Sequence, residues 1–94
     1  MKPPVKVLTR ELKIKNQYGI HARPAALFVK TASRYDADVY VEKDGNRVSG
    51  KSIMGLLTLE GSCGTVLKVT AEGSDAEDVL NDLEALVASK FDEE

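Results

Sequence analysis

The stretch DVYVEKDGNRVSG, residues 38–50, decides how the fold is interpreted. It contains two short segments with strand character, 38–43 and 46–50, and the residues between them are Asp44 and Gly45. An Asp-Gly pair accepts the positive backbone φ angles that a tight two-residue turn requires. The stretch therefore predicts a β-hairpin.

Two further segments have strand patterns. Residues 7–14 place Leu8, Leu12 and Ile14 on one face of an extended chain, with polar residues on the other face. Residues 65–71 are a further strand. Together with the hairpin, these segments predict four strands.

Helical patterns occupy the segments between the strands. Residues 22–33 carry apolar side chains at helical spacing, and Pro24 lies near the start, where its missing N–H costs nothing. Ser52 precedes a short apolar run that ends at Gly61. A cap residue and a stop glycine in these positions predict a brief helix.

The last helix is predicted to begin with a capping box, in which Ser74 is the cap and Glu77 lies three residues later. The order strand, helix, strand, strand, helix, strand, helix predicts an α+β fold, an open-faced sandwich with helices on one face of an antiparallel sheet. The 94 residues form one domain, with residues 1–6 as a loose leader and residues 91–94 as an acidic tail that frays.

Composition narrows the possible functions. The formal net charge is -2 and no basic stripe is present, so nucleic-acid binding is not expected. No segment approaches the roughly 20 apolar residues that span a bilayer, and the N-terminus lacks the apolar core of a signal peptide, which predicts a cytoplasmic protein without membrane insertion. The single cysteine, Cys63, and the single histidine, His21, cannot form a disulfide or a four-ligand zinc site, so no metal or cofactor is expected. The three tyrosines are expected to be half-buried packing residues.

The segment around His21 has the features of an anion site. His21 and Arg23 are two residues apart where the first helix begins, and the first backbone N–H groups of a helix have no intrahelical acceptors. The partial positive charge of the helix end disfavours imidazolium, which leaves His21 available as a neutral nucleophile. In the alternative interpretation, His21 only caps the helix and Arg23 is solvated. Local chemistry leaves both possibilities open.

The segment around Ser52 also allows two interpretations. By position Ser52 is a helix cap, and most such serines have no other role. Apolar residues on a short, weak helix can instead form a docking surface. The candidate docking residues beside Ser52 are Lys51, Ile53, Met54 and Leu57.

Two motifs resemble those of one protein family. The run GIHARPA, residues 19–25, resembles the active-site signature of HPr, the family of histidine phosphocarriers in the bacterial phosphoenolpyruvate-dependent phosphotransferase system. The run KSIMGLL, residues 51–57, resembles the regulatory serine segment of that family, at the spacing the family has. The resemblance covers roughly residues 7–90. It implies a four-stranded antiparallel sheet of order 1-4-2-3 with three helices.

The resemblance also implies a relay function. Enzyme I would phosphorylate Nδ1 of His21 with the assistance of Arg23, and the phosphoryl group would pass to an enzyme IIA domain. HPr kinase/phosphorylase would phosphorylate Ser52, and a transcription regulator is a further possible partner. The chain is expected to act as a monomer. Docking is expected through Ala22, Pro24, Lys51, Ile53, Met54 and Leu57.

Three alternative functions remain. The acidic ending, residues 91–94, also resembles the nitrogen-related regulatory branch of the family (the NPr type), whereas Ser52 with Ile53 and Met54 resembles the kinase-regulated type. The chain could instead be a purely regulatory module that binds through the Ser52 surface. A thiol-dependent enzyme would need a base beside Cys63, and the sequence offers no obvious one.

Overall fold

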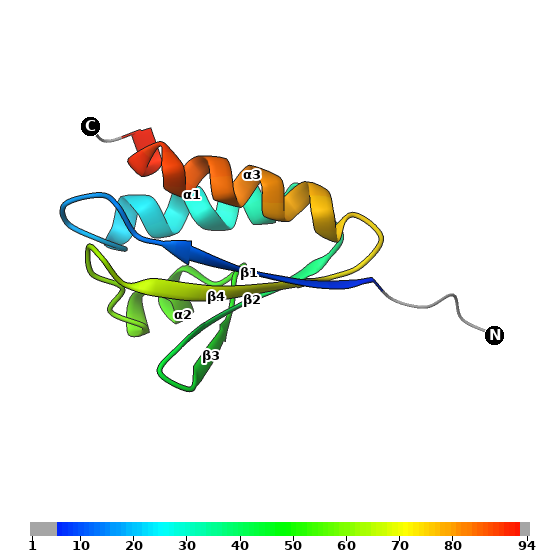
Figure 1. Cartoon of the computed structure of the whole chain (residues 1–94), viewed down its shortest axis with the longest axis horizontal. Helices are drawn as coiled ribbons and strands as arrows, with labels where there is room; N and C mark the ends of the chain where they lie inside the picture. The colour runs from blue at the N-terminus through cyan, green and yellow to red at the C-terminus, as the bar shows by residue number, and fades with distance from the viewer. Residues whose placement is uncertain (1–5, 93–94) are drawn as a thin grey trace.

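The computed structural model describes residues 6–92, which form one sheet and three α-helices (Figure 1). The elements, in chain order, are β1 (Val7–Lys13), α1 (Ala22–Ala32), β2 (Asp38–Lys43), β3 (Asn46–Ser49), α2 (Ile53–Thr58), β4 (Val66–Glu72), α3 (Ala76–Ala88) and a short 3-10 turn, η1 (Lys90–Asp92). The strands lie in the order β1-β4-β2-β3, and every neighbouring pair is antiparallel. The predicted fold class and the strand order implied by the resemblance are both confirmed.

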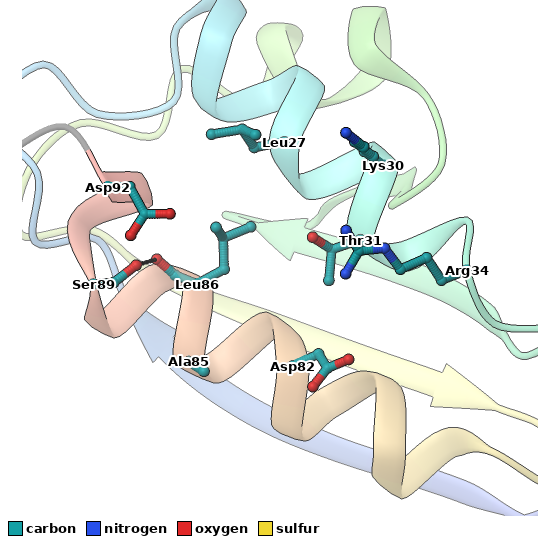
Figure 2. Close-up of a pocket in the computed structure, with 9 residues that line it drawn as sticks. All are labelled: Leu27, Lys30, Thr31, Arg34, Asp82, Ala85, Leu86, Ser89 and Asp92. Carbon is teal, nitrogen blue, oxygen red and sulfur yellow. Dashed lines mark hydrogen bonds between the residues drawn. The ribbon is translucent and has the colours of Figure 1, made fainter.

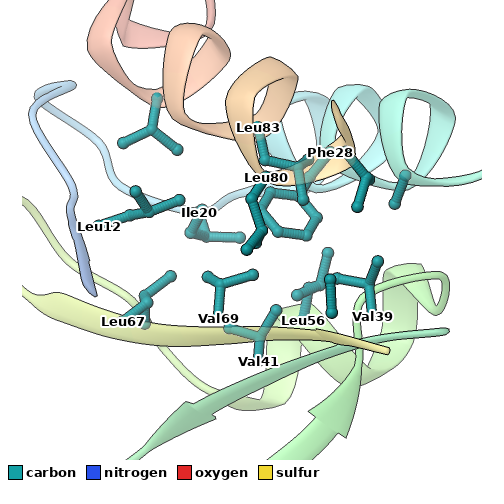
Figure 3. Close-up of a cluster of buried hydrophobic side chains, with 14 of the residues drawn as sticks. Leu12, Ile20, Phe28, Val39, Val41, Leu56, Leu67, Val69, Leu80 and Leu83 are labelled. Carbon is teal, nitrogen blue, oxygen red and sulfur yellow. The ribbon is translucent and has the colours of Figure 1, made fainter. Parts of the chain in front are cut away.

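One face of the sheet forms the core. Helices α1 and α3 contact each other above this face (Figure 1), and α2 contacts both α1 and β3. Alternate strand residues point into the layer between sheet and helices, because successive side chains of a strand lie on opposite faces. The principal core side chains, shown in Figure 3, are Leu12, Ile20, Phe28, Val39, Val41, Leu56, Leu67, Val69, Leu80 and Leu83.

The other face of the sheet carries opposite charges in register. Across the four strands, one row consists of Glu11, Lys68, Glu42 and Arg47, so negative and positive side chains alternate from edge to edge. Opposite charges directly across a strand pair are favourable, whereas like charges would be unfavourable. Arg47 also lies 3.9 Å from the centre of the Tyr40 ring. With these charged side chains, the face of the sheet that no helix covers can stay in contact with water.

The hairpin forms as the sequence predicts. Lys43 and Asn46 are directly paired, which leaves Asp44 and Gly45 as a two-residue turn. Their φ angles are 51° and 82°, both in the left-handed region. This geometry explains why the turn uses an Asp-Gly pair.

The predicted capping box at the last helix is wrong. Helix α3 begins at Ala76, and its N-cap is Asp75 rather than Ser74. The Asp75 carboxylate makes no capping bond to its own helix, because it accepts the backbone N–H groups of Asp36 and Ala37, each at 2.9 Å. The start of α3 is thereby tied to the loop before β2, a long-range contact that sequence spacing does not reveal.

The prediction for the C-terminal end is wrong, whereas the loose leader at the N-terminal end stays a prediction. Of the predicted leader, residues 1–5 lie outside the described residues, while the carbonyl of Lys6 accepts the N–H of Gly73 at 2.8 Å. The prediction that the tail frays from Phe91 is wrong, because the Phe91 side chain is 0% exposed and belongs to the core. Within residues 6–92, no helix has the length and apolar character to cross a bilayer.

A polar contact joins the end of α1 to α3. The hydroxyl of Tyr35 donates a hydrogen bond to the carboxylate of Asp82. This bond, partial burial and the negative charges of Asp82 and Asp78 raise the pKa of Tyr35 above its ordinary value of 10.0, and Arg34 opposes the shift. A raised pKa means that the folded state favours the neutral phenol.

We predict that Phe91→Ala lowers the free energy of unfolding by about 3–5 kcal/mol, the usual cost of removing a buried phenylalanine side chain. Urea denaturation monitored by circular dichroism measures this loss. The control is Asp92→Ala at the exposed neighbouring position, which should stay within about 0.5 kcal/mol of the parent. Equal effects of the two substitutions would contradict the anchoring role of Phe91.

We also predict that the Tyr35–Asp82 contact makes stability depend on pH in the alkaline range. The contribution is fully present below pH 10, the ordinary pKa of tyrosine, and is lost as pH rises through the higher pKa of the folded state. Tyr35→Phe should therefore be less stable than the parent at pH 7 and should approach it at high pH. Tyr18→Phe is the control, because Tyr18 is 75% exposed. Parallel curves of the unfolding free energy against pH for the parent and Tyr35→Phe would contradict the prediction.

Candidate functional site

His21 is the N-cap residue of α1. Its backbone is extended, with φ -95° and ψ -170°, and its carbonyl accepts the first helical hydrogen bond from Ala25 N–H at 3.0 Å. The imidazole makes no capping bond to the first turn. The side chain is half-buried. The position is therefore that of a cap, but the side chain does not act as one.

The first turn of α1 is suited to an anion. The N–H groups of Ala22 and Arg23 have no acceptor inside the helix, and Pro24 has no N–H. No acidic side chain lies in this turn, whereas α3 has two in its own first turn. Arg23 is exposed and has no ion-pair partner among residues 6–92. The helix end thus keeps its partial positive charge beside the imidazole.

A glycine contact fixes the approach to His21. Gly19 has a φ of 67°, and a Cβ there would lie 2.2 Å from the carbonyl oxygen of Gly61. Next to it, Ile20 donates its N–H to the same oxygen at 2.7 Å, and its side chain is buried. Gly61 does not have the positive φ that is typical of a glycine after a helix; that φ occurs one residue earlier, at Glu60 (53°). A Cβ at Gly61 would lie 3.2 Å from the Ile20 side chain, so the glycine serves this close packing.

Tyr18 lies beside His21. The two rings meet edge to face, with their centres 6.3 Å apart and an angle of 84° between their planes. At 75% exposure, Tyr18 is not the half-buried packing residue that was expected. The sequence feature that could have indicated this exposure is the position of Tyr18 in the turn, three residues before His21.

Ser52 is the N-cap of α2, as predicted. Its hydroxyl accepts the N–H of Gly55 at 3.0 Å. The side chain is half-buried, and the first turn of α2 contains no acidic residue.

Three of the expected docking residues are exposed. Ala22 lies at the surface beside His21, and Met54 and Ile53 of α2 are 72% and 41% exposed. Large apolar side chains with such exposure are available for contact with another protein.

The other three expected docking residues have contacts within the protein. Pro24 is buried. Leu57 is half-buried and packs against the core. Lys51 donates from Nζ to the carbonyl of Tyr35 at 2.9 Å. Pro24 is therefore the one of the six expected docking residues whose side chain is not at the surface.

The predicted sites at His21 and Ser52 lie toward opposite ends of α2. Ser52 precedes the helix, and its neighbour Lys51 contacts Tyr35, beyond the end of α1. Gly61, after the other end of α2, contacts Ile20 beside His21.

A groove of about 390 Å³ lies elsewhere, between α1 and α3 (Figure 2). Lys30 and Arg34 border it on one side, and Asp82 and Asp92 on the other. His21 does not line it, and is placed at the surface, where another protein can reach it. Within residues 6–92, no three His, Cys, Asp or Glu side chains gather as a metal site would require.

Comparison with known proteins identifies the family. The family model described as "PTS HPr component phosphorylation site" matches residues 8–89. The phosphocarrier protein HPr of Treponema pallidum (strain Nichols) is 40% identical over 88 residues, which are 94% of this chain and 100% of that protein. A crystal structure of HPr from Thermoanaerobacter tengcongensis has a TM-score of 0.89 and 49% identity, covering 93% of this chain and 98% of the other.

Crh, a catabolite repression protein of Bacillus subtilis, is also similar. Its crystal structure has a TM-score of 0.72 and 43% identity, covering 86% of this chain and 93% of the other, and it is described as an intertwined dimer with domain swapping. The family thus includes regulatory members as well as carriers. Because the match extends over nearly the whole chain and includes both motifs, this chain belongs to the HPr family of phosphocarriers.

Proposed function

We propose that this protein is a cytoplasmic relay, which accepts a phosphoryl group from phosphorylated enzyme I on Nδ1 of His21 and passes it to an enzyme IIA domain. The observation that carries the proposal is the position of His21, a half-buried imidazole at a helix N-terminus without an acidic side chain in its first turn. Membership of the HPr family supports the same chemistry.

The transfer exchanges one bond to phosphorus for another. The lone pair of Nδ1 forms the new N–P bond as the bond between phosphorus and the donor breaks, so the ring must be neutral, with its proton on Nε2. The N–H groups of Ala22 and Arg23, which have no acceptor inside the helix, and the exposed Arg23 guanidinium would stabilise the added negative charge. This stabilisation has to be modest, because a tightly held phosphoryl group could not be passed on.

Donor and acceptor would use one docking surface, which extends from Ala22 beside His21 to Ile53 and Met54 at the start of α2. Exposed apolar side chains provide contact area, and a flexible Met54 can adapt to two different partners. Using the same surface for both partners would make them bind in turn, as a relay requires.

Ser52 supports a second level of control. Phosphorylation by an HPr kinase/phosphorylase would place a dianion next to Ile53 and Met54. Ser52 precedes α2, whereas the contact with the loop before His21 follows this helix, so the two phosphates would lie toward different ends of α2. Control would therefore act mainly on the docking surface rather than by direct repulsion between two phosphates. A transcription regulator is the partner class that would read the phosphorylated form.

Experiments can distinguish the relay from the other candidate functions. The likeness to Crh favours, as the second candidate, a regulatory module that binds through the Ser52 surface without carrying phosphate on His21. The nitrogen-related branch of the family would share the His21 chemistry and differ in its partners. A thiol enzyme has less support, because the Cys63 thiol is directed at the carbonyl of Lys15, at 3.8 Å. The monomeric state stays a prediction, to be measured by sedimentation.

We predict that the parent protein, incubated with phosphoenolpyruvate and enzyme I, gains an acid-labile phosphate and that His21→Ala gains none. Mass spectrometry and 31P NMR measure the product. Lys68→Ala, on the uncovered sheet face, is the control and should be phosphorylated like the parent. If the parent takes up no phosphate while the Ser52 surface still binds a partner, the regulatory module is the better description.

We predict that Ser52→Asp and Ser52→Ala differ in opposite ways in their stability and in their rate of phosphoryl transfer. Aspartate is as good a cap as serine, so Ser52→Asp should keep its stability but accept phosphate from enzyme I more slowly, because its charge lies beside the docking surface. Ser52→Ala should lose about 1 kcal/mol of stability with the cap and should transfer normally when folded. Transfer to Ser52→Asp at the rate of the parent would refute the regulatory role.

A further inference from the structure

Asn16 occupies an unusual place for a polar side chain. Among the residues described, it is the one polar residue that is fully buried, at 0% exposure. It precedes His21 by five positions and begins the turn that leads into α1. Burying an amide is unfavourable unless hydrogen bonds compensate for the lost water. The hydrogen bonds of Asn16 therefore indicate why an amide is buried at this position.

Asn16 closes the turn through both its backbone and its side chain. Its carbonyl accepts the N–H of Gly19 at 3.2 Å, and its Nδ2 donates to the carbonyl of Gly19 at 2.7 Å. The side-chain bond is the shorter of the two. The orientation of the peptide group after Gly19 is thus determined by a buried amide.

The same carbonyl oxygen leads directly to His21. It also accepts the backbone N–H of His21 at 3.1 Å, so one oxygen joins the Asn16 side chain to the His21 main chain. Between them, Ile20 is held by its bond to the Gly61 carbonyl at 2.7 Å. Both peptide groups before His21 are therefore fixed by hydrogen bonds.

We infer that Asn16 is a positioning residue for phosphoryl transfer, whose buried amide holds His21 in its extended conformation through the carbonyl of Gly19. The inference rests on the proposed function. In this conformation the imidazole lies at the helix end without capping it, so Nδ1 can receive the phosphoryl group near the first-turn N–H groups. Without the amide donor, the Gly19 carbonyl could rotate, and the imidazole would reach that geometry in only part of the population.

Two substitutions of Asn16 test the inference. Asn16→Asp has the same shape but no N–H donor when ionised, and Asn16→Ala removes the donor without adding a charge. Asn46→Asp, in the exposed hairpin, is the matched control for the change of charge. Urea denaturation gives the folded fraction of each variant, so that rates can be expressed per folded molecule.

The kinetic measurement is the rate of transfer from phosphorylated enzyme I as the concentration of the variant rises. We expect a maximal rate about tenfold lower for both Asn16 variants, with an unchanged half-saturating concentration, because the docking surface stays intact. The control should match the parent. A merely structural role would lower the folded fraction and leave the maximal rate per folded molecule within twofold of the parent, which would overturn the inference.

An NMR measurement decides the inference independently of enzyme I. Imidazole 1H–15N spectra report the tautomer of His21, and the backbone amide signal of His21 reports its bond to Gly19. Both should change in Asn16→Ala and stay the same in Asn46→Asp. Unchanged His21 signals in Asn16→Ala would overturn the positioning role. A parent protein that accepts no phosphate would instead overturn the proposed function, and the NMR comparison would still stand.

Discussion

The contact between Gly19 and Gly61 is the constraint on which the functional surface depends. A Cβ at Gly19 would lie 2.2 Å from the Gly61 carbonyl oxygen, so the two loops can meet only where a side chain is missing. Their close approach lets Ile20 donate to that oxygen and bury its own side chain. As a result the chain enters α1 at a fixed place beside the end of α2. His21, at the start of α1, lies near the end of α2 for this reason, although the two segments are far apart in the sequence.

The sheet supplies the rigidity that this contact needs. The two loops that meet at Gly19 and Gly61 follow β1 and precede β4, and these strands pair along their whole length. Beyond the paired strands, Ile14 donates to the Thr65 carbonyl at 2.8 Å and Gly64 donates to the Ile14 carbonyl at 2.7 Å. The ladder therefore continues into the loops and limits their movement. A surface residue such as His21 can keep a defined backbone because its loop is anchored at both ends.

Local signals explain what the sequence predicts correctly. The Asp44-Gly45 turn, the Ser52 cap and the helical start at His21 depend on residues close in the chain, so spacing and residue type were sufficient. Asp75 shows the limit, because its carboxylate satisfies two N–H groups that lie 38 and 39 residues away. Phe91 is a similar case, since an acidic ending suggests fraying and only the assembled core shows where the ring lies. The strand order came from the family resemblance alone, because the pattern of strands and helices allows more than one antiparallel arrangement.

The arrangement of α2 bears on how one small surface could serve both transfer and control. The helix has only six residues, and both ends are tied to α1 or to the residues that flank it, at Lys51 and at Gly61. A charge added at Ser52 therefore has little freedom to move α2, whose start already has a hydroxyl cap. Its main effect would be on what approaches Ile53 and Met54. A rigid scaffold of this kind favours control by the chemistry of the docking surface over control by a change of shape, because the anchored loop keeps His21 in place in either state.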